Sequence, residues 1–165
     1  MSSGGGVIIR PMRKTDVARA VEIAGRLPHA PHWPPEAYRT ALDATASLRR
    51  IALVAERPPS PAAEPGAALA LVGFAVASVI APQAEIETIA VAAEEQRRGT
   101  GGQLLRALLG ELRTAGVKEI LLEARASNQA ALRLYAAVGF RQTGVRPRYY
   151  ADPQEDAVLM ALQDL

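Results

Sequence analysis

The sequence predicts a mixed α/β (α+β) domain, in which a central β-sheet carries helices on both faces. Short apolar runs bounded by turn residues indicate strands, and apolar residues at helical spacing indicate helices. The two kinds of element follow one another in the order β-α-α-β-β-β-α-β-α-β-β. The β-α-β crossovers in this order require parallel neighbouring strands, whereas the hairpins require antiparallel ones. A mixed sheet satisfies both requirements.

Composition narrows the class of protein. A chain of 165 residues has the size of one domain, and 49% apolar with 22% charged residues is typical of a soluble globular protein. The formal charge of +2 is too small for a nucleic-acid-binding surface, so no direct nucleic-acid partner is expected. The chain has no cysteine, which excludes disulfides and thiolate chemistry and suits a reducing cytoplasm.

We expect residues 1–6 to be a flexible leader and residues 7–165 to form a single domain. The start, MSSGGG, lacks the basic and apolar regions of a signal peptide. The longest uncharged apolar stretch, residues 67–81, is too short for a membrane-spanning helix and favours a buried strand. No membrane partner is therefore expected. These features leave the oligomeric state open.

The first elements are a short strand and two helices separated by prolines. Residues 7–9 read as a strand, and Thr15 is the predicted N-cap of the helix that follows. Four prolines between residues 28 and 35 interrupt the helical pattern, and residues 36–46 form the second predicted helix. This joint carries His29 and His32, which have no third ligand nearby in sequence, so no metal site is expected.

Three strands and the longest helix follow. The strands are predicted over residues 51–55, 68–80 and 86–91, with the proline-rich residues 58–66 as a loop of no assigned function between the first two. Leucines at helical spacing predict a helix over residues 101–115, with Gly116 at the position where a helix-terminating glycine belongs.

The last part of the chain alternates strand, helix and two strands. Residues 119–124 include three consecutive apolar residues and are predicted to be buried on both faces of the sheet. Asn128 is positioned to cap a helix that ends at Gly139. Strands over residues 140–145 and 157–162 complete the predicted sheet.

A glycine-rich loop stands between the strand ending at Val91 and the leucine-rich helix. Glycines at a helix N-terminus let backbone N–H groups approach phosphate oxygens, the helix dipole favours negative charge, and arginines add charge-assisted bonds. A diphosphate would fit this loop; the alternative is a simple glycine turn with solvated arginines. The pattern is neither a Walker loop nor a dinucleotide fingerprint. The loop comprises Gln96, Arg97, Arg98, Gly99, Thr100, Gly101 and Gly102.

The same loop carries a resemblance to a known family. The pattern Q-x-x-G-x-G after a strand resembles the coenzyme A loop of the GNAT superfamily of N-acetyltransferases. The segments EARASN at residues 123–128, LY at 134–135 and GF at 139–140 resemble the next motif of the RimI-type N-terminal acetyltransferases. The segment RYYAD at residues 148–152 resembles the substrate loop of peptide N-terminal acetyltransferases.

The resemblance implies a GNAT-like fold and acetyl-coenzyme A as cosubstrate. Besides the loop, it places Ile89, Ala90 and Val91 against the coenzyme arm, with Val91 N–H as the donor that stabilises charge on the acetyl oxygen. It places Asn128 near the same arm, and capping of a helix is compatible with that role.

The resemblance also assigns the chemistry. Glu123 is the general base, in a strand where partial desolvation would favour a neutral carboxyl; the alternative is a structural ion pair with Arg125 or Arg141. Tyr135 is the acid that protonates the leaving thiolate, and a core tyrosine is the alternative. Glu85 and Glu87 are reserve candidates for the base, or exposed glutamates on a polar face.

Three aromatic residues are assigned to the acceptor. Tyr149 and Tyr150, in the expected penultimate loop, would cover the first residues of an acceptor peptide, unless they only cover the end of the sheet. Trp33, with Tyr38, resembles an aromatic pair that such enzymes carry between their first two helices.

Three functions remain open at this point. The first is acetylation of a protein N-terminal α-amine, with a ribosomal protein as the family's best-known target. The second is acetylation of a small-molecule amine on the same scaffold. The third is a coenzyme A-binding module without catalysis. Fold and coenzyme loop are shared among these functions, so the sequence cannot name the acceptor.

Overall fold

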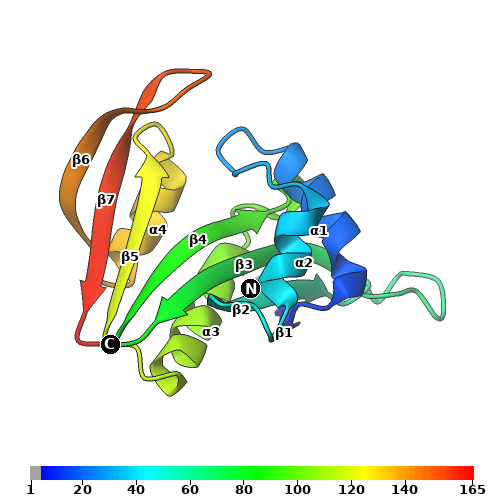
Figure 1. Ribbon diagram of the computed structural model, residues 1–165. Coiled ribbons are helices and arrows are strands. Elements are labelled where there is room, and N and C mark those ends of the chain that lie inside the picture. The colour runs from blue at the N-terminus through cyan, green and yellow to red at the C-terminus, as the bar shows by residue number, and fades with distance from the viewer. Residues whose placement is uncertain (1–4) are drawn as a thin grey trace.

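A computed structural model describes residues 5–165. A seven-stranded mixed sheet, with strand order β1-β2-β3-β4-β5-β7-β6, runs through the molecule and carries helices on both faces (Figure 1). All neighbouring strands are antiparallel except β4 and β5. The strands are β1 (Ile8–Pro11), β2 (Arg49–Arg57), β3 (Ala70–Ile80), β4 (Gln83–Val91), β5 (Glu119–Arg125), β6 (Arg141–Tyr150) and β7 (Glu155–Gln163).

The helices occur where the sequence predicts them, with shifted ends. They are α1 (Val17–Gly25), α2 (Pro35–Leu42), α3 (Thr100–Thr114) and α4 (Gln129–Ala137), with short 3-10 turns over Lys14–Asp16 and Ala93–Glu95. The predicted order of elements and the mixed sheet are thereby confirmed. Of the predicted leader, residues 1–4 lie outside the described residues. Gly5 and Gly6 precede β1, and the Gly5 carbonyl accepts a hydrogen bond from Arg57.

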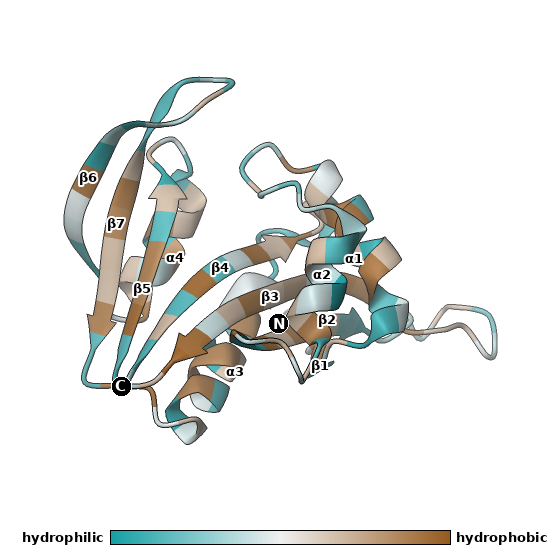
Figure 2. Cartoon of the chain, viewed as in Figure 1, coloured by the Kyte–Doolittle hydropathy of each residue, from teal (hydrophilic) through white to brown (hydrophobic). Residues whose placement is uncertain are grey.

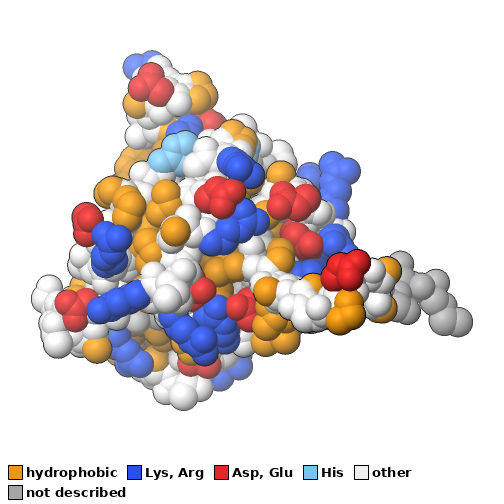
Figure 3. Space-filling view, turned by 90° about the vertical axis from the view of Figure 1, so that its right-hand side faces the viewer, with side chains coloured by type: hydrophobic (Ala, Val, Ile, Leu, Met, Phe, Trp, Pro, Cys, Tyr) orange, Lys and Arg blue, Asp and Glu red, His pale blue; other side chains and the backbone are white. Residues whose placement is uncertain are grey.

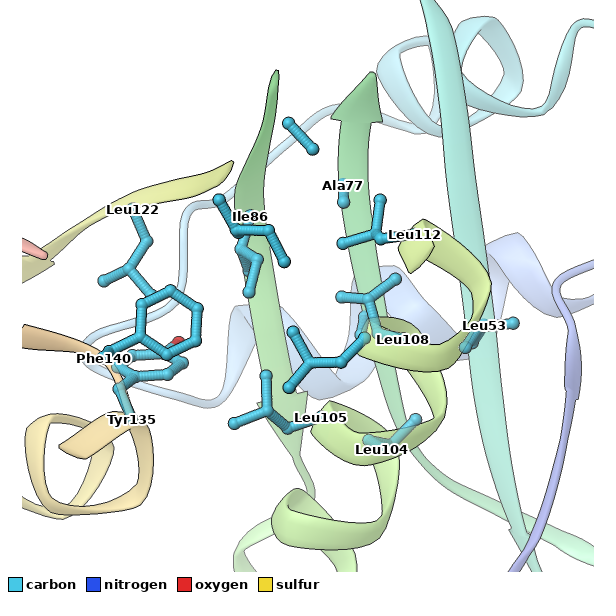
Figure 4. Packing of buried hydrophobic residues seen from close by; sticks show 14 of the residues in the cluster. Leu53, Ala77, Ile86, Leu104, Leu105, Leu108, Leu112, Leu122, Tyr135 and Phe140 are labelled. Atoms are coloured by element: carbon cyan, nitrogen blue, oxygen red, sulfur yellow. The ribbon is translucent and has the colours of Figure 1, made fainter. Parts of the chain in front are cut away.

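Two apolar layers hold the helices against the sheet. On one face α3 packs on β2, β3 and β4 through leucines 104, 105, 108 and 112, and Tyr135 of α4 belongs to the same apolar cluster (Figure 4). On the other face α1 and α2 cover Val54, Phe74 and Val76, with Tyr38 packed edge-on against Phe74. Because successive residues of a strand point to opposite faces, Leu53 and Val54 serve different layers. Figure 2 shows brown, apolar segments along the central strands.

Close packing of α3 depends on a glycine in the middle of β3. A Cβ atom at Gly73 would lie 2.9 Å from the Ala90 carbonyl oxygen and 3.0 Å from Leu104 Cδ1. No side chain fits there without displacing β4 or α3. The predicted end of α3 is also confirmed: Gly116 has φ +84°, and Val117 N–H and Gly116 N–H donate to the Leu112 and Arg113 carbonyls. These two bonds form a Schellman motif.

Thr15 is not the N-cap of the first helix, and α2 is shorter than predicted. Thr15 lies inside the 3-10 turn, whose Asp16 carboxylate instead accepts from the Arg13 N–H and from Arg10. Helix α2 ends at Leu42 rather than at residue 46. Asp43 leaves the helical conformation there, and its carboxylate accepts from the N–H and the hydroxyl of Thr45. A local side-chain turn therefore competes successfully with the last helical turn.

Two predictions about the last strands are wrong in detail. Strand β5 is not buried on both faces: Ile120 and Leu122 are buried, but Leu121 is 39% exposed. Strand β6 does not end at residue 145 but continues to Tyr150, so Tyr149 and Tyr150 lie in a strand rather than in a loop. The antiparallel partner β7 supplies backbone hydrogen-bond groups along this extension, which the sequence pattern of β6 alone does not reveal.

One face of the molecule shows basic and acidic side chains interspersed, with no region of a single sign (Figure 3). In the part of the chain that the structure describes, no helix is long and apolar enough to cross a membrane.

Candidate active site

The parallel strands β4 and β5 separate part of the way along their length. They are paired only from Gln83–Glu119 to Ile86–Leu122, and beyond that point they diverge (Figure 1). A cavity of about 1060 Å³ lies at this fork. Its walls come from both diverging strands, the N-termini of α3 and α4, the loop after α1 and the end of β6. The fork therefore brings together segments that are far apart in the sequence.

The end of β4 turns unpaired backbone groups toward the fork. The Ala92 N–H donates to the Val72 carbonyl of β3, and backbone groups of successive residues point to opposite sides of a strand. The groups of Val91 and Ile89 therefore face the side where β5 has diverged. One of these groups, the Val91 carbonyl oxygen, accepts a hydrogen bond from Gln96 Nε2 over 3.1 Å. The role of Val91 N–H as a donor to substrate stays a prediction.

The N-terminus of α3 opens onto the same cavity. Gly99, with φ +82°, is the N-cap residue, and the first helical hydrogen bond runs from Gln103 N–H to the Gly99 carbonyl. The N–H groups of residues 100–102 thus have no acceptor within the helix. A Cβ atom at Gly101 would touch Leu134 of α4 at 3.4 Å, so glycine keeps this end of α3 close to α4. Free N–H groups and the positive end of the helix dipole make an anion-binding site.

The two arginines of the loop differ in position. Arg97 lines the cavity and has a left-handed φ of +65°. Arg98 is absent from the cavity wall, and its Nη1 lies 2.9 Å from a carboxylate oxygen of Glu95. Glu95 itself is 6% exposed and also contacts Arg57. Sequence reasoning did not connect Glu95 with Arg57, because nothing local indicates that residues 38 positions apart form an ion pair.

Glu123 lies where β5 leaves β4, with its side chain on the cavity wall. Its carboxylate is 3.3 Å from Nε of Arg146 on β6. The alternative ion pairs with Arg125 or Arg141 are wrong: Arg125 instead pairs with Glu155 at 3.3 Å. The Arg146 side chain is 56% exposed, so the contact is open to solvent. The Glu123 carboxylate is therefore not held by an enclosed ion pair.

Tyr135 is a residue of α4. Tyr135 is 7% exposed, its ring packs against Phe140 (Figure 4), and the residue also lines the cavity. The two ring centroids are 5.7 Å apart. The core role and the site role are thus compatible. Burial raises the pKa of Tyr135 to about 12, so the phenol keeps its proton at neutral pH. Asn128 caps the same helix, accepting from the Ala131 N–H over 3.3 Å, and also lines the cavity.

The two reserve glutamates of β4 differ in their partners. Glu87 lies at a register shift in the β3–β4 ladder, and its carboxylate is 2.8 Å from Nε of Arg50. Glu85 faces Glu123 and Glu87, and burial together with these two charges raises its pKa. Both residues line the cavity. Their surroundings show that Glu87 is held by a cation across the sheet, whereas Glu85 stands among like charges.

The predicted acceptor residues are only partly brought together. Tyr149 and Tyr150 line the cavity, packed edge-to-face with centroids 5.0 Å apart, and the Arg125 guanidinium lies 4.4 Å from the Tyr150 ring centroid. Trp33 is not on the cavity wall; it packs against Tyr38 with centroids 5.3 Å apart. Residues 27–31, which follow α1, line the cavity and include His29. The sequence analysis weighed His29 only as a metal ligand. The prolines between residues 28 and 35, which interrupt the helical pattern, were the sequence signal that could have pointed to this loop.

Comparison with known proteins shows the family of this chain. The profile of the "Acetyltransferase (GNAT) family" matches residues 25–140, and the chain belongs to this family. The resemblance seen in the sequence is thereby confirmed.

Particular relatives carry the comparison further. The chain is 45% identical over 94 residues to the "[Ribosomal protein bS18]-alanine N-acetyltransferase" of Salmonella typhimurium; the match covers 56% of this chain and 64% of that protein, less than two-thirds of its length. The structure of the ribosomal-protein-S18-alanine N-acetyltransferase from Escherichia coli aligns over 96% of this chain and 94% of that chain, with a TM-score of 0.75 and 31% identity. Ard1 from Thermoplasma volcanium aligns over 97% and 99%, with a TM-score of 0.77 and 26% identity.

Proposed function

We propose that the protein transfers an acetyl group from acetyl-coenzyme A to the N-terminal α-amine of a protein. The observation that carries the proposal is the fork between β4 and β5, where one cavity joins an anion-binding helix N-terminus to Glu123 and Tyr135. The family, and relatives that are named as alanine N-acetyltransferases, support the same activity.

The residues at one end of the cavity fit the donor. The free N–H groups at residues 100–102 and the cavity-lining Arg97 match a diphosphate, and we call this region the donor end. The unpaired backbone of Ile89 and Val91 then lies along the way toward Glu123, where it can hydrogen-bond the amide-bearing arm and the acetyl carbonyl. Acetyl-coenzyme A supplies an acyl group activated as a thioester.

The proposed chemistry uses two residues of the chain for proton transfer. An α-ammonium group has a pKa of about 8, so Glu123, directly or through a water, needs only to remove one proton to expose the nucleophilic lone pair. Val91 N–H would stabilise the negative charge that develops on the acetyl oxygen as the amine attacks. Tyr135, protonated at neutral pH, would then donate a proton to the departing thiolate, and its phenolate would regain a proton from the second one that the nitrogen loses as the amide forms.

The other end of the cavity fits a peptide terminus. Here Tyr149 and Tyr150 face the loop at residues 27–31 across the cavity, and we call this region the acceptor end. Tyrosine rings give broad contact area at low entropic cost, which suits a short extended peptide. The relatives' names point more narrowly to an alanine of a ribosomal protein, an acceptor that would place the reaction in the cytoplasm.

Mass spectrometry of acetylated products tests the proposal. The purified protein is incubated with acetyl-coenzyme A and two matched sets of acceptors: peptides with a free N-terminus, and small amines such as polyamines and amino acids. We expect acetylation of free peptide N-termini and none of the same peptides with a blocked N-terminus. Preference for a small amine would support the second function considered above. Binding of coenzyme A without turnover on any acceptor would support the non-catalytic module.

A further inference from the structure

A buried ion-pair cluster lies directly behind the donor end. Arg57, at the end of β2, donates from Nη2 to a carboxylate oxygen of Glu95 over 2.8 Å and from Nε over 3.2 Å. The same Nη2 lies 3.3 Å from the hydroxyl oxygen of Thr100. The side chains of Arg57 and Glu95 are 15% and 7% exposed, and Thr100 is 1% exposed. The contacts are therefore shielded from water. Enclosed ion pairs are screened less by salt than exposed ones.

The guanidinium of Arg57 connects the two ends of the diphosphate loop. Glu95 precedes residues 96–99 and Thr100 follows them, so one side chain fixes the start and the end of this four-residue segment. Within the segment Arg97 and Gly99 both have left-handed φ angles, a conformation that costs free energy at a non-glycine residue. Contacts that hold both ends keep the loop in this conformation and its amides directed at the cavity.

The charges of the cluster also matter to an anion. Glu95 lines the cavity beside the helix N-terminus, where a lone carboxylate would repel a diphosphate. Arg57 and Arg98 both contact Glu95, so two positive charges surround one negative charge. The cluster as a whole then favours anion binding. Loss of Arg57 would both free the loop ends and leave Glu95 with only the half-exposed Arg98.

We infer that Arg57 is a positioning residue for the donor: it acts through Glu95 and Thr100 on the loop that binds the diphosphate of coenzyme A. This inference rests on the proposed function. Arg57 belongs to β2, on the far side of β3 from β4, and no local sequence pattern connects it with the loop.

The test separates donor binding from turnover. Arg57→Met keeps the length of the aliphatic stem and removes the charge. We expect the KM for acetyl-coenzyme A, and the Kd for coenzyme A by calorimetry, to rise roughly tenfold, the effect of losing charge-assisted bonds that preorganise the site. We expect kcat at saturating donor and the KM for the acceptor peptide to stay within about twofold, because neither depends on loop placement once the donor is bound.

Three further variants complete the experiment. Arg98→Met, which removes the exposed partner of the same carboxylate, should raise the donor KM less than Arg57→Met does. Arg57→Lys keeps one contact but cannot span both loop ends, so an intermediate KM is expected, and it serves if Arg57→Met does not fold. Adding Glu95→Gln to Arg57→Met should recover part of the lost affinity, because the uncompensated carboxylate is gone.

The failures are distinguishable. If the wild-type protein takes up no coenzyme A, the proposed function itself is contradicted. If the wild-type protein binds coenzyme A and the folded Arg57 variants bind it equally well, only the inference about Arg57 is overturned. A fall in kcat with unchanged donor KM would also overturn the inference, since it would indicate a general loss of folded enzyme.

Discussion

The donor end of the cavity holds its arginine–carboxylate pair enclosed, whereas the acceptor end holds one open to solvent. Arg57 and Glu95 are 15% and 7% exposed and 2.8 Å apart. Arg146 and Glu123 are 56% and 21% exposed and 3.3 Å apart. A buried ion pair holds its two side chains in place, because breaking it would leave an unpaired charge that water cannot reach. An exposed pair exchanges its partner at little cost. The first arrangement suits the proposed donor loop, which would have to stay in place, and the second suits the proposed role of Glu123 as a base that accepts a proton from an amine.

The surroundings of the two pairs repeat this difference. Strands β2–β4 are covered by helices on both faces, with no room for a Cβ atom at Gly73. Strand β6, at the edge of the sheet, is mostly exposed and is linked to its neighbours by polar and aromatic contacts such as Arg125 on Tyr150. We therefore expect substitutions at the donor side to act on stability and donor affinity, and those at the acceptor side to act on turnover and acceptor choice.

The largest effect is expected for Glu123→Gln. The amide cannot accept the proton of the α-ammonium group, so turnover should fall roughly 100-fold, within the range of general-base contributions. The melting temperature should change little, because the pair with Arg146 is exposed. Initial rates with a free N-terminal peptide measure the first quantity. Glu85→Gln is the matched control, and a rate lower than that of Glu123→Gln would transfer the role of base to Glu85.

Tyr135→Phe should lower turnover by about tenfold, because the ring remains packed on Phe140 while the proton donor is lost. The effect is smaller than for Glu123→Gln since a thiolate is already a fair leaving group. Steady-state rates with acetyl-coenzyme A at saturation provide the measurement. If Tyr135→Phe turns over at the wild-type rate, Tyr135 is not the proton donor and has only its role in the core.

The same substitution has a signature in alkaline unfolding. The folded pKa of Tyr135 is about 12, against about 10 in an unfolded chain. The folded state therefore binds this proton more tightly, and the resulting stability is present below about pH 10 and is lost as the pH rises toward 12. Tyr135→Phe lacks this loss, so its unfolding free energy should fall less steeply than that of the wild type from about pH 10 to 12. Parallel slopes in denaturant titrations would contradict the assignment.

Gly73→Ala tests the rigid packing of the donor side. The added Cβ meets the Ala90 carbonyl oxygen and Leu104, and overpacking of this kind costs about 1–3 kcal/mol. Urea denaturation should show this loss. Gly110→Ala, at a site on α3 with nothing within 4 Å, is the control and should be neutral or stabilising. If both variants unfold at the wild-type midpoint, the packing at Gly73 is looser than described.

The smallest effect on stability is expected for Arg146→Met. The Arg146–Glu123 contact is solvent-exposed, so its loss should cost less than about 1 kcal/mol. Arg57→Met should cost more, because it removes contacts to a carboxylate that is almost fully enclosed. The two variants are compared in the same denaturant titration. A larger loss for Arg146→Met would reverse the comparison between the two ends.

Much of the site is encoded in short stretches of sequence. Glycines at a predicted helix start located the anion site, and Asn128 and Gly116 marked the ends of two helices, because capping depends on neighbouring backbone groups. The roles of Glu123 and Tyr135 came from a family resemblance, and the structure places both on one cavity wall without testing their chemistry. The extension of β6 could not be foreseen, since it needs β7 as a partner.

The sequence by itself determined the order of elements, the glycine loop at the start of α3 and the family to which the chain belongs. Only the tertiary structure decided which arginine meets which carboxylate, where β4 and β5 part, and which loop closes the acceptor end. The physical reason is range: capping and helical periodicity act between residues a few positions apart, whereas the pairing of Arg57 with Glu95 depends on the register and packing of the whole sheet.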